Sequence, residues 1–144
     1  MSTGNTPLLL PVTAATIERF MRAQVSCWNA HDRAGFIALY REMAPLSLEI
    51  EYVGRTDQRD GWFVMEEMWD KHNTQITLEV GTTIQNGNEV ALHHRNLIVG
   101  TDLAIESIEI YRFEPGRIFV RYFLKPPGGE GVDTEQFRGL AQEV

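Results

Sequence analysis

Two kinds of periodicity divide the chain into a helical first part and a strand-rich second part. Apolar residues recur at helical spacing after Thr13, a candidate N-cap, and predict a helix over residues 14–29. A second helical stripe follows Asp32 and stops before Pro45, because proline disfavours helical geometry in the residue that precedes it. The chain is therefore expected to begin with two helices.

Beyond Pro45 the apolar period changes to strict alternation. Residues 48–52 alternate between apolar and acidic side chains, which is typical of a half-buried strand. The segment from Asp60 to about Lys71 is too apolar for a surface loop and contains good helix formers, so it predicts a short third helix. Turn sequences such as Asn86-Gly87-Asn88 separate four further strands. These strands are predicted over residues 75–84, 89–99, 103–113 and 118–124.

This order of elements indicates an α+β fold. Long strands joined by hairpins would form a strongly curved, mixed or antiparallel sheet around the N-terminal helices, in the shape of a cone. A curved sheet that faces helices leaves an apolar cavity, where small ligands usually bind. We expect one domain over residues 14–127, with an arm at residues 1–13 before it. A tail at residues 128–144 would follow, with Phe137 and Leu140 on one side.

Composition and charge narrow the classes of partner. With 43% hydrophobic and 23% charged residues among 144, the chain has ordinary globular composition. Its formal net charge of −7 is a poor match to nucleic acid or to an anionic membrane surface. No apolar run approaches the ~20 residues needed to span a bilayer, so we expect a cytoplasmic protein without a membrane partner. The single cysteine, Cys27, cannot form an internal disulfide.

Polar residues interrupt the apolar rows that the first helix and the strands should turn inward. In the strand predicted over residues 103–113 the opposite face is apolar too, and we assign the row with Ser107 and Glu109 to the inside. The inward polar residues are then Gln24, Tyr52, His94, Asn96, Ser107 and Glu109.

Together in an apolar cone, these side chains could perform acid–base chemistry, because a histidine–carboxylate pair can move protons near neutral pH. One inward histidine and one carboxylate are too few for a metal site, so we expect neither a metal nor a cofactor. The candidate catalytic residues are His94, Tyr52, Glu109 and Asn96. The candidate substrate-binding residues are Gln24, Trp28, Tyr40, Trp69, Leu92, Ser107, Tyr111 and Tyr122.

Each of these residues also has a structural interpretation. His94 is compatible with a core histidine whose nitrogens are hydrogen-bonded. Glu109 could pair with Arg95 or Arg121 at a dimer face instead of entering a cavity. The tyrosines are compatible with ordinary aromatic packing. Only the convergence of several inward polar residues favours a functional site.

Local signatures include Trp28-Asn29-Ala30-His31-Asp32 and Tyr111-Arg112-Phe113-Glu114-Pro115-Gly116-Arg117-Ile118. With the element order over residues 14–127, they resemble the NTF2-like superfamily, which includes ketosteroid isomerase, limonene epoxide hydrolase, SnoaL-type cyclases and scytalone dehydratase. Within it, Leu48-Glu49-Ile50-Glu51-Tyr52 and Leu124-Lys125-Pro126 are most similar to scytalone dehydratase. The resemblance implies a cone-shaped fold around a small-molecule pocket.

The similarity to scytalone dehydratase covers its site only in part. Tyr52 stands where that enzyme has a tyrosine that binds water and the carbonyl region of the substrate. Trp28 and Asn29 stand where it has a tyrosine and an aspartate, and one of its two catalytic histidines falls near Leu78. The resemblance therefore does not imply the same set of catalytic groups.

The other relatives leave the reaction open. Glu109 matches the protonated acid in the oxyanion hole of ketosteroid isomerase, Glu51 or the tyrosine after it matches the base, and Gln24 replaces a tyrosine donor. His94 and Asn96 occupy the places of an arginine and an aspartate in the epoxide hydrolases.

We expect a cofactor-independent lyase that removes water or a small carbonyl fragment from a small, apolar, aromatic alcohol. His94, poised by Glu109, would move the proton, while Tyr52, Asn96 and Gln24 would hold the oxygen. The alternatives are an isomerase that works through a dienolate, an epoxide hydrolase, and a non-catalytic binding domain.

A homodimer or higher homo-oligomer is a separate expectation. It would form through the outer face of the sheet, opposite the predicted pocket. The residues that point to this face are Arg95, Phe119, Arg121 and Phe123.

Overall fold

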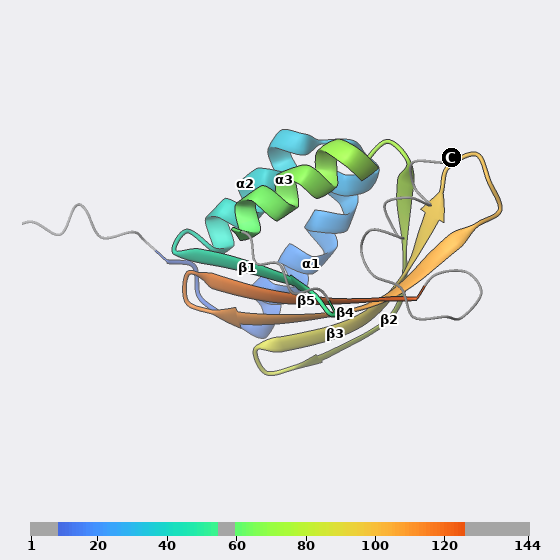
Figure 1. Cartoon of the computed structure of the whole chain (residues 1–144). Coiled ribbons are helices and arrows are strands. Elements are labelled where there is room, and N and C mark those ends of the chain that lie inside the picture. Colours follow the sequence, from blue (N-terminus) through green and yellow to red (C-terminus); the bar gives the residue numbers. More distant parts are fainter. Residues whose placement is uncertain (1–8, 55–59, 126–144) are drawn as a thin grey trace, which may run out of the picture.

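The computed structural model describes residues 9–54 and 60–125, which form three helices and five strands (Figure 1). The elements are α1 (Ala14–Asn29), α2 (Arg33–Met43), β1 (Ser47–Tyr52), α3 (Gly61–His72), β2 (Ile76–Asn86), β3 (Glu89–Ile98), β4 (Ala104–Glu114) and β5 (Arg117–Lys125). Every predicted helix and strand is confirmed, with bounds that differ by no more than two residues. Most of the predicted arm, and the whole predicted tail with Phe137 and Leu140, lie outside the described residues.

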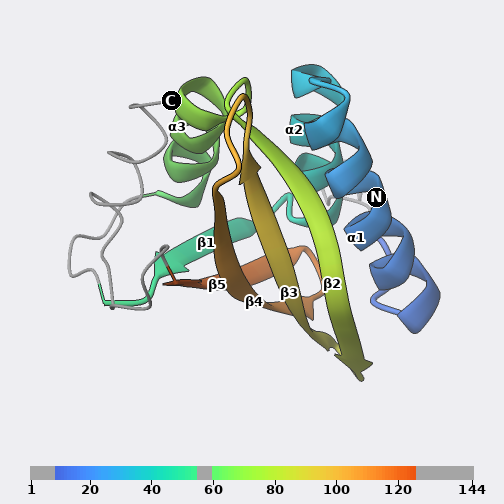
Figure 2. The same ribbon diagram turned by 90° about the vertical axis from the view of Figure 1, so that its right-hand side faces the viewer.

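The five strands form one curled, open sheet in the order β1-β5-β4-β3-β2. The hairpin-linked strands pair antiparallel, whereas β1 pairs parallel with β5, so the sheet is mixed. Parallel neighbours cannot be joined by a hairpin, and here α3 and three further strands separate the two. The sheet curls toward the helices, which lie along its inner face (Figure 2). The expected α+β cone is therefore confirmed.

A side-chain cap begins each of the three helices. Thr13, Asp32 and Asp60 each accept a hydrogen bond from the backbone N–H group three residues further along. Such a bond satisfies one of the amide groups that have no partner in the first turn of a helix. The caps therefore fix where α1, α2 and α3 start relative to the sheet.

Trp28 joins the helical layer to the sheet. Its ring makes edge contacts with Phe36 of α2 and Trp69 of α3, at centroid distances of 5.8 and 5.0 Å. Its indole Nε1 donates a hydrogen bond of 2.9 Å to the carbonyl oxygen of Ile76, at the start of β2. Buried aromatic contacts of this kind add to the stabilisation from burial alone. Trp28 thereby fixes α1 over the inner face of the sheet.

Candidate active site

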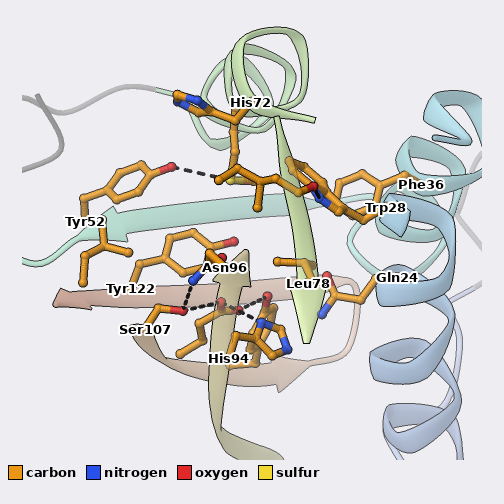
Figure 3. A pocket seen from close by; sticks show the side chains of 15 residues that line it. Gln24, Trp28, Phe36, Tyr52, His72, Leu78, His94, Asn96, Ser107 and Tyr122 are labelled. Carbon is orange, nitrogen blue, oxygen red and sulfur yellow. Dashed lines mark hydrogen bonds and ion pairs between the residues drawn. The ribbon is translucent and has the colours of Figure 1, made fainter. Parts of the chain in front are cut away.

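A cavity of about 60 Å³ lies between α1, α3 and the inner face of the sheet (Figure 3). Most of the residues that line it are apolar or aromatic. Its polar end is formed by four buried residues of β3 and β4, here called the polar quartet. The polar quartet consists of His94, Asn96, Ser107 and Glu109.

The strand register brings the polar quartet together. His94 of β3 lies directly opposite Ser107 of β4, and Asn96 and Glu109 are each two residues away on the same faces. Side chains two residues apart point to the same side of a strand, so all four face the cavity. The alternation in the sequence predicts this arrangement correctly.

Glu109 is the centre of the polar quartet. Its Oε2 atom lies 2.9 Å from Nδ1 of His94 and accepts a hydrogen bond of 3.1 Å from the Ser107 hydroxyl. Its Oε1 atom accepts a hydrogen bond of 3.0 Å from the hydroxyl of Tyr111. Three groups that can donate hydrogen bonds therefore surround this carboxyl group.

The position of the hydrogen on His94 depends on the charge of Glu109. Beside an ionised carboxylate, Nδ1 of the imidazole must carry the hydrogen. In the neutral ring Nε2 then has the lone pair, and among the described residues no side chain forms a hydrogen bond with it. A histidine oriented by a carboxylate in this way is suited to accept and release protons.

The orientation of the Asn96 amide is fixed by its partners. Its Nδ2 atom donates to the carbonyl oxygen of Ile105 at 2.6 Å and to the hydroxyl of Ser107 at 3.1 Å. A carbonyl oxygen can only accept, so the nitrogen must be on that side. The amide oxygen of Asn96 is therefore available to accept a hydrogen bond from a ligand.

The rest of the cavity wall is mainly apolar. Trp28, Leu78 and Leu124 contribute to it from α1, β2 and β5. The Tyr52 hydroxyl lies 3.5 Å from Sδ of Met68, and the Tyr52 ring packs against that of Tyr122 at 5.3 Å. A ligand in this cavity would place a polar end at the polar quartet and an apolar body against the apolar part of the wall.

Three buried tyrosines surround the carboxyl group of Glu109. Burial raises the pKa values of Tyr40, Tyr111 and Tyr122 above the ordinary value of 10.0, and repulsion from the Glu109 carboxylate adds to each shift. These phenols therefore stay neutral at physiological pH. Tyr111 serves Glu109 as a hydrogen-bond donor, and Tyr40 donates to the amide oxygen of Gln24.

Most of the residues predicted for the site do line the cavity. The polar quartet is joined there by residues from α1, β1, β4 and β5. These further predicted residues are Gln24, Trp28, Tyr52, Tyr111 and Tyr122.

Three predicted binding residues are not among those that line the cavity. Tyr40 is 1% exposed behind Gln24, and Trp69 packs behind Trp28. Leu92 faces the cavity side of β3 but borders a separate groove between α1 and the sheet. Alternation and helical spacing predict which face of a strand or helix a residue occupies. Whether the residue also reaches the cavity depends on how the side chains pack.

Six lining residues were not predicted. His72 is the most notable, because it is a buried histidine at the end of α3. It stands four residues after Met68, so helical spacing places both on one face, and this signal was present in the sequence. The unpredicted lining residues are Phe36, Met68, His72, Ile76, Leu78 and Leu124.

Two roles considered for the acidic residues do not fit the geometry. Glu51 is exposed on the outer face of β1, where it pairs with Arg121 at 3.0 Å, so it is not a base in the cavity. Arg95 pairs with Glu79 at 3.0 Å. Glu109 is therefore not the partner of either arginine at a dimer face.

Within residues 9–54 and 60–125, no group of three or more His, Cys, Asp and Glu side chains could hold a metal ion. In those same ranges, no helix has the length and apolar character needed to cross a membrane.

Comparison with known proteins identifies relatives with the same fold. The model of the SnoaL-like domain matches residues 17–121, more than half of the chain. The chain belongs to the SnoaL-like domain family. This confirms the resemblance to the NTF2-like superfamily, whose fold includes cyclases, isomerases and epoxide hydrolases. A search of curated proteins finds no match.

Solved structures of this SnoaL-like fold extend over most of the chain. A steroid delta-isomerase from Pseudomonas aeruginosa has a TM-score of 0.64 and 16% identity, with 93% of each chain covered. SalBIII, an epoxide hydrolase/cyclase-like enzyme of pyran ring formation in salinomycin, has a TM-score of 0.63 and 20% identity over 85% of this chain and 99% of its own. An M. tuberculosis LEH-like epoxide hydrolase has a TM-score of 0.57 and 17% identity, over 80% of this chain and 86% of its own. At these identities the likeness shows the fold alone.

Proposed function

We propose that this SnoaL-like protein is a cofactor-independent acid–base lyase acting on a small, apolar, aromatic alcohol. The observation that carries the proposal is the buried His94–Glu109 pair at the polar end of an otherwise apolar cavity. A carboxylate–imidazole pair held away from bulk water is suited to transfer protons near neutral pH. Membership of a family whose fold includes cofactor-independent enzymes supports it.

Two reactions fit this pair. In a dehydration, the pair takes a proton from a carbon next to the carbinol and gives a proton to the departing hydroxyl group. A C–H and a C–O bond break, while a C=C bond and a water molecule form. In a retro-aldol cleavage, the pair takes the hydroxyl proton as the C–C bond breaks and returns it to the enolate carbon. In both reactions the pair ends with its original protons.

Two amide groups can hold the oxygen of the substrate. The amide oxygen of Asn96 can accept a hydrogen bond from a substrate hydroxyl. The amide nitrogen already donates to the carbonyl oxygen of Ile105 and to the hydroxyl of Ser107. Nε2 of Gln24 contacts Sδ of Met21 at 3.6 Å, and a thioether is a weak acceptor that a substrate oxygen can replace. The hydroxyl of Tyr52 and Nε2 of Gln24 would donate to the oxygen on which negative charge develops, whereas Asn96 would only orient the substrate hydroxyl.

The size of the cavity limits the substrate. A volume of about 60 Å³ holds a few water molecules, whereas pockets for drug-sized ligands measure about 300 Å³ or more. We propose a compound with one aromatic ring, whose entry moves Met68 and Leu124 outward. Methionine suits this role because its unbranched side chain adapts to different shapes.

Isomerisation of an enone is the second candidate. The likeness to a steroid delta-isomerase covers 93% of each chain, and Glu109 and Tyr111 place a carboxyl and a phenol 3.0 Å apart at the polar end. In this reaction the His94–Glu109 pair would carry a proton from one carbon to another. The product would then have the same mass as the substrate.

A thermal-shift screen followed by mass spectrometry tests the proposal. The compounds would be aromatic carbinols, diols, enones and phenols, since any ligand of the folded state raises the melting temperature. Loss of water or of a carbonyl fragment supports the lyase, whereas an isomer of unchanged mass supports the second candidate. Compounds that bind and emerge unchanged would show a binding domain and contradict catalysis.

The chain supplies a matched control for the site variants. His93 and Glu106 form a second histidine–carboxylate pair, with 2.7 Å between Nε2 and Oε1, on the outer face of the same two strands. His94→Gln and Glu109→Gln should each lower kcat by ~10²-fold or more, the usual range for removing a general acid or base. His93→Gln and Glu106→Gln should leave kcat within about twofold, because surface changes rarely reach a buried site. Equal losses from both pairs would contradict the assignment.

A further inference from the structure

His94 borders a second hollow as well as the cavity. A groove of about 510 Å³ runs between α1 and the adjoining strands β2 and β3, and His94 contributes to its wall. Met21, Val25 and Leu92 give this groove an apolar floor, whereas Ser26 and Gln85 make part of it polar. Along β3 the cavity and the groove are consecutive, with His94 at the boundary between them.

The two nitrogens of an imidazole point in different directions, so only one of them can face Glu109. Nδ1 does so, at 2.9 Å from Oε2. The other nitrogen of His94 is turned away from the polar quartet, toward the side of α1 (Figure 3). The groove lies on that side, because five of the residues that line it belong to α1.

We propose that the groove is a proton path and that His94 relays protons between groove water and Glu109. Glu109 is then the member of the pair that exchanges a proton with the substrate in the cavity. This inference rests on the proposed acid–base function of the pair. The relay itself can be measured without any substrate.

The relay conserves protons at each step. A hydronium ion in the groove gives a proton to Nε2 of His94 and is left as water, and the proton on Nδ1 passes to Oε2 of Glu109. The imidazole is then neutral with its hydrogen on Nε2, and Glu109 is protonated. The reverse sequence returns the proton to the groove and restores the first tautomer.

The pairing of β2 with β3 is irregular beside His94. Val80 of β2 pairs with His94 in the register, and the next pair, Thr83 with Leu92, follows a register shift. A shift of this kind bends the strand and interrupts its pairing. The charged residues that line the groove are Glu18 and Arg22 of α1, exposed side chains whose charged groups lie 3.5 Å apart.

Few other charged or titratable groups surround His94. Glu109 and Tyr111 face it from β4, and Glu18 and Arg22 face the groove from α1. The residues of β2 that line the groove are uncharged. A measurement on the His94 ring therefore reports mainly on Glu109 and on access of water.

Exchange of the hydrogen that Nε2 of His94 carries in the second tautomer tests the relay, because that hydrogen comes from groove water and returns to it. The full chain with ¹⁵N-labelled histidine has four imidazoles, and the signal absent from His94→Gln identifies His94. Saturation transfer from water then measures the exchange rate of the hydrogen on Nε2. Val80→Trp would fill the groove, and we expect it to slow this exchange several-fold.

Two controls make the result decisive. Ile84→Trp adds the same side chain to β2 at a residue that does not line the groove, and it should leave the rate unchanged. Leu124→Trp would narrow the cavity instead, and it should also leave the rate unchanged. Thr83→Trp, which also faces the groove, replaces Val80→Trp if that variant does not fold.

An unchanged rate in the groove variant, with the new indole shown by NOE to contact His94, would overturn the proposal. Slower exchange in Leu124→Trp alone would also overturn it, because protons would then enter through the cavity. Neither result depends on turnover. A failed search for a substrate would contradict the proposed function and leave the relay standing.

Discussion

At the scale of single residues, burial and not sequence position determines what the tyrosines around Glu109 can do. Tyr40, Tyr111 and Tyr122 are buried, and each has a raised pKa. A phenol that stays neutral keeps its hydrogen and donates it in a hydrogen bond. Tyr111 therefore stabilises the Glu109 carboxylate and does not transfer a proton to it. The proton-transfer chemistry is thereby confined to the His94–Glu109 pair.

These tyrosines predict a loss of stability in alkaline solution. Below their ordinary pKa of 10.0, both the folded and the unfolded chain keep the phenol protons. Above it, only the unfolded chain releases them, so the free energy of unfolding should fall by up to about 1.4 kcal/mol per pH unit for each tyrosine. Urea unfolding between about pH 8 and about pH 11 measures this slope. Tyr122→Phe should make the slope shallower, and an unchanged slope would contradict the explanation.

The sequence predicts the polar quartet and misses other parts of the cavity. His94, Asn96, Ser107 and Glu109 stand out because a polar side chain in an apolar row of a strand is unusual. Phe36 and Ile76 carry no such signal, since an apolar residue that lines a cavity looks the same in sequence as one in the core. For this reason Tyr40 and Trp69 were assigned to the pocket, although they lie behind its wall.

At the scale of elements, the hairpin of β3 and β4 positions the polar quartet, and α3 contributes Met68 and His72 to the cavity that the quartet faces. The order and bounds of these elements follow from the sequence, because caps, turn residues and the change of period are local signals. The parallel pairing of β1 with β5 is not local, since the two strands are far apart in the chain. Such pairing depends on which surfaces remain to be covered once the hairpins have formed.

Gly61 sets the position of α3, and its substitution is a test at this scale. A Cβ atom there would stand 2.1 Å from the carbonyl oxygen of Leu48, so the first turn of α3 would have to move away from β1. Gly61→Ala should destabilise the fold by about 1–3 kcal/mol, the usual cost of overpacking. Urea unfolding measures the change, with Glu66→Ala on the exposed side of α3 as the control. Equal stabilities would show that β1 does not fix the helix.

At the scale of the whole molecule, the outer face of the sheet has the features of a contact surface. Ile108 is 45% exposed there, and the guanidinium groups of Arg112 and Arg121 lie over the rings of Phe119 and Phe123, at 4.2 and 5.2 Å. Aromatic and arginine side chains are enriched in protein interfaces. We therefore expect two copies of the chain to associate through this face.

Light scattering at micromolar concentration tests this association. The wild-type protein should have the mass of a dimer, and Ile108→Glu should shift it toward the monomer because a charge would be buried in the contact. Leu46→Glu, at a comparably exposed residue before β1, is the control and should remain dimeric. A monomeric wild-type protein would refute the expectation.

The polar quartet lies within one contiguous stretch of chain, from His94 to Glu109, whereas the apolar wall is assembled from α1, α2, α3, β1, β2 and β5 as well. The reactive groups and the shape of the pocket are thus encoded by different segments of the chain. A single hairpin graft would carry the proton-transfer groups into another scaffold of this fold. Conversely, substitutions in the wall can diversify the accepted compound while the chemistry stays constant.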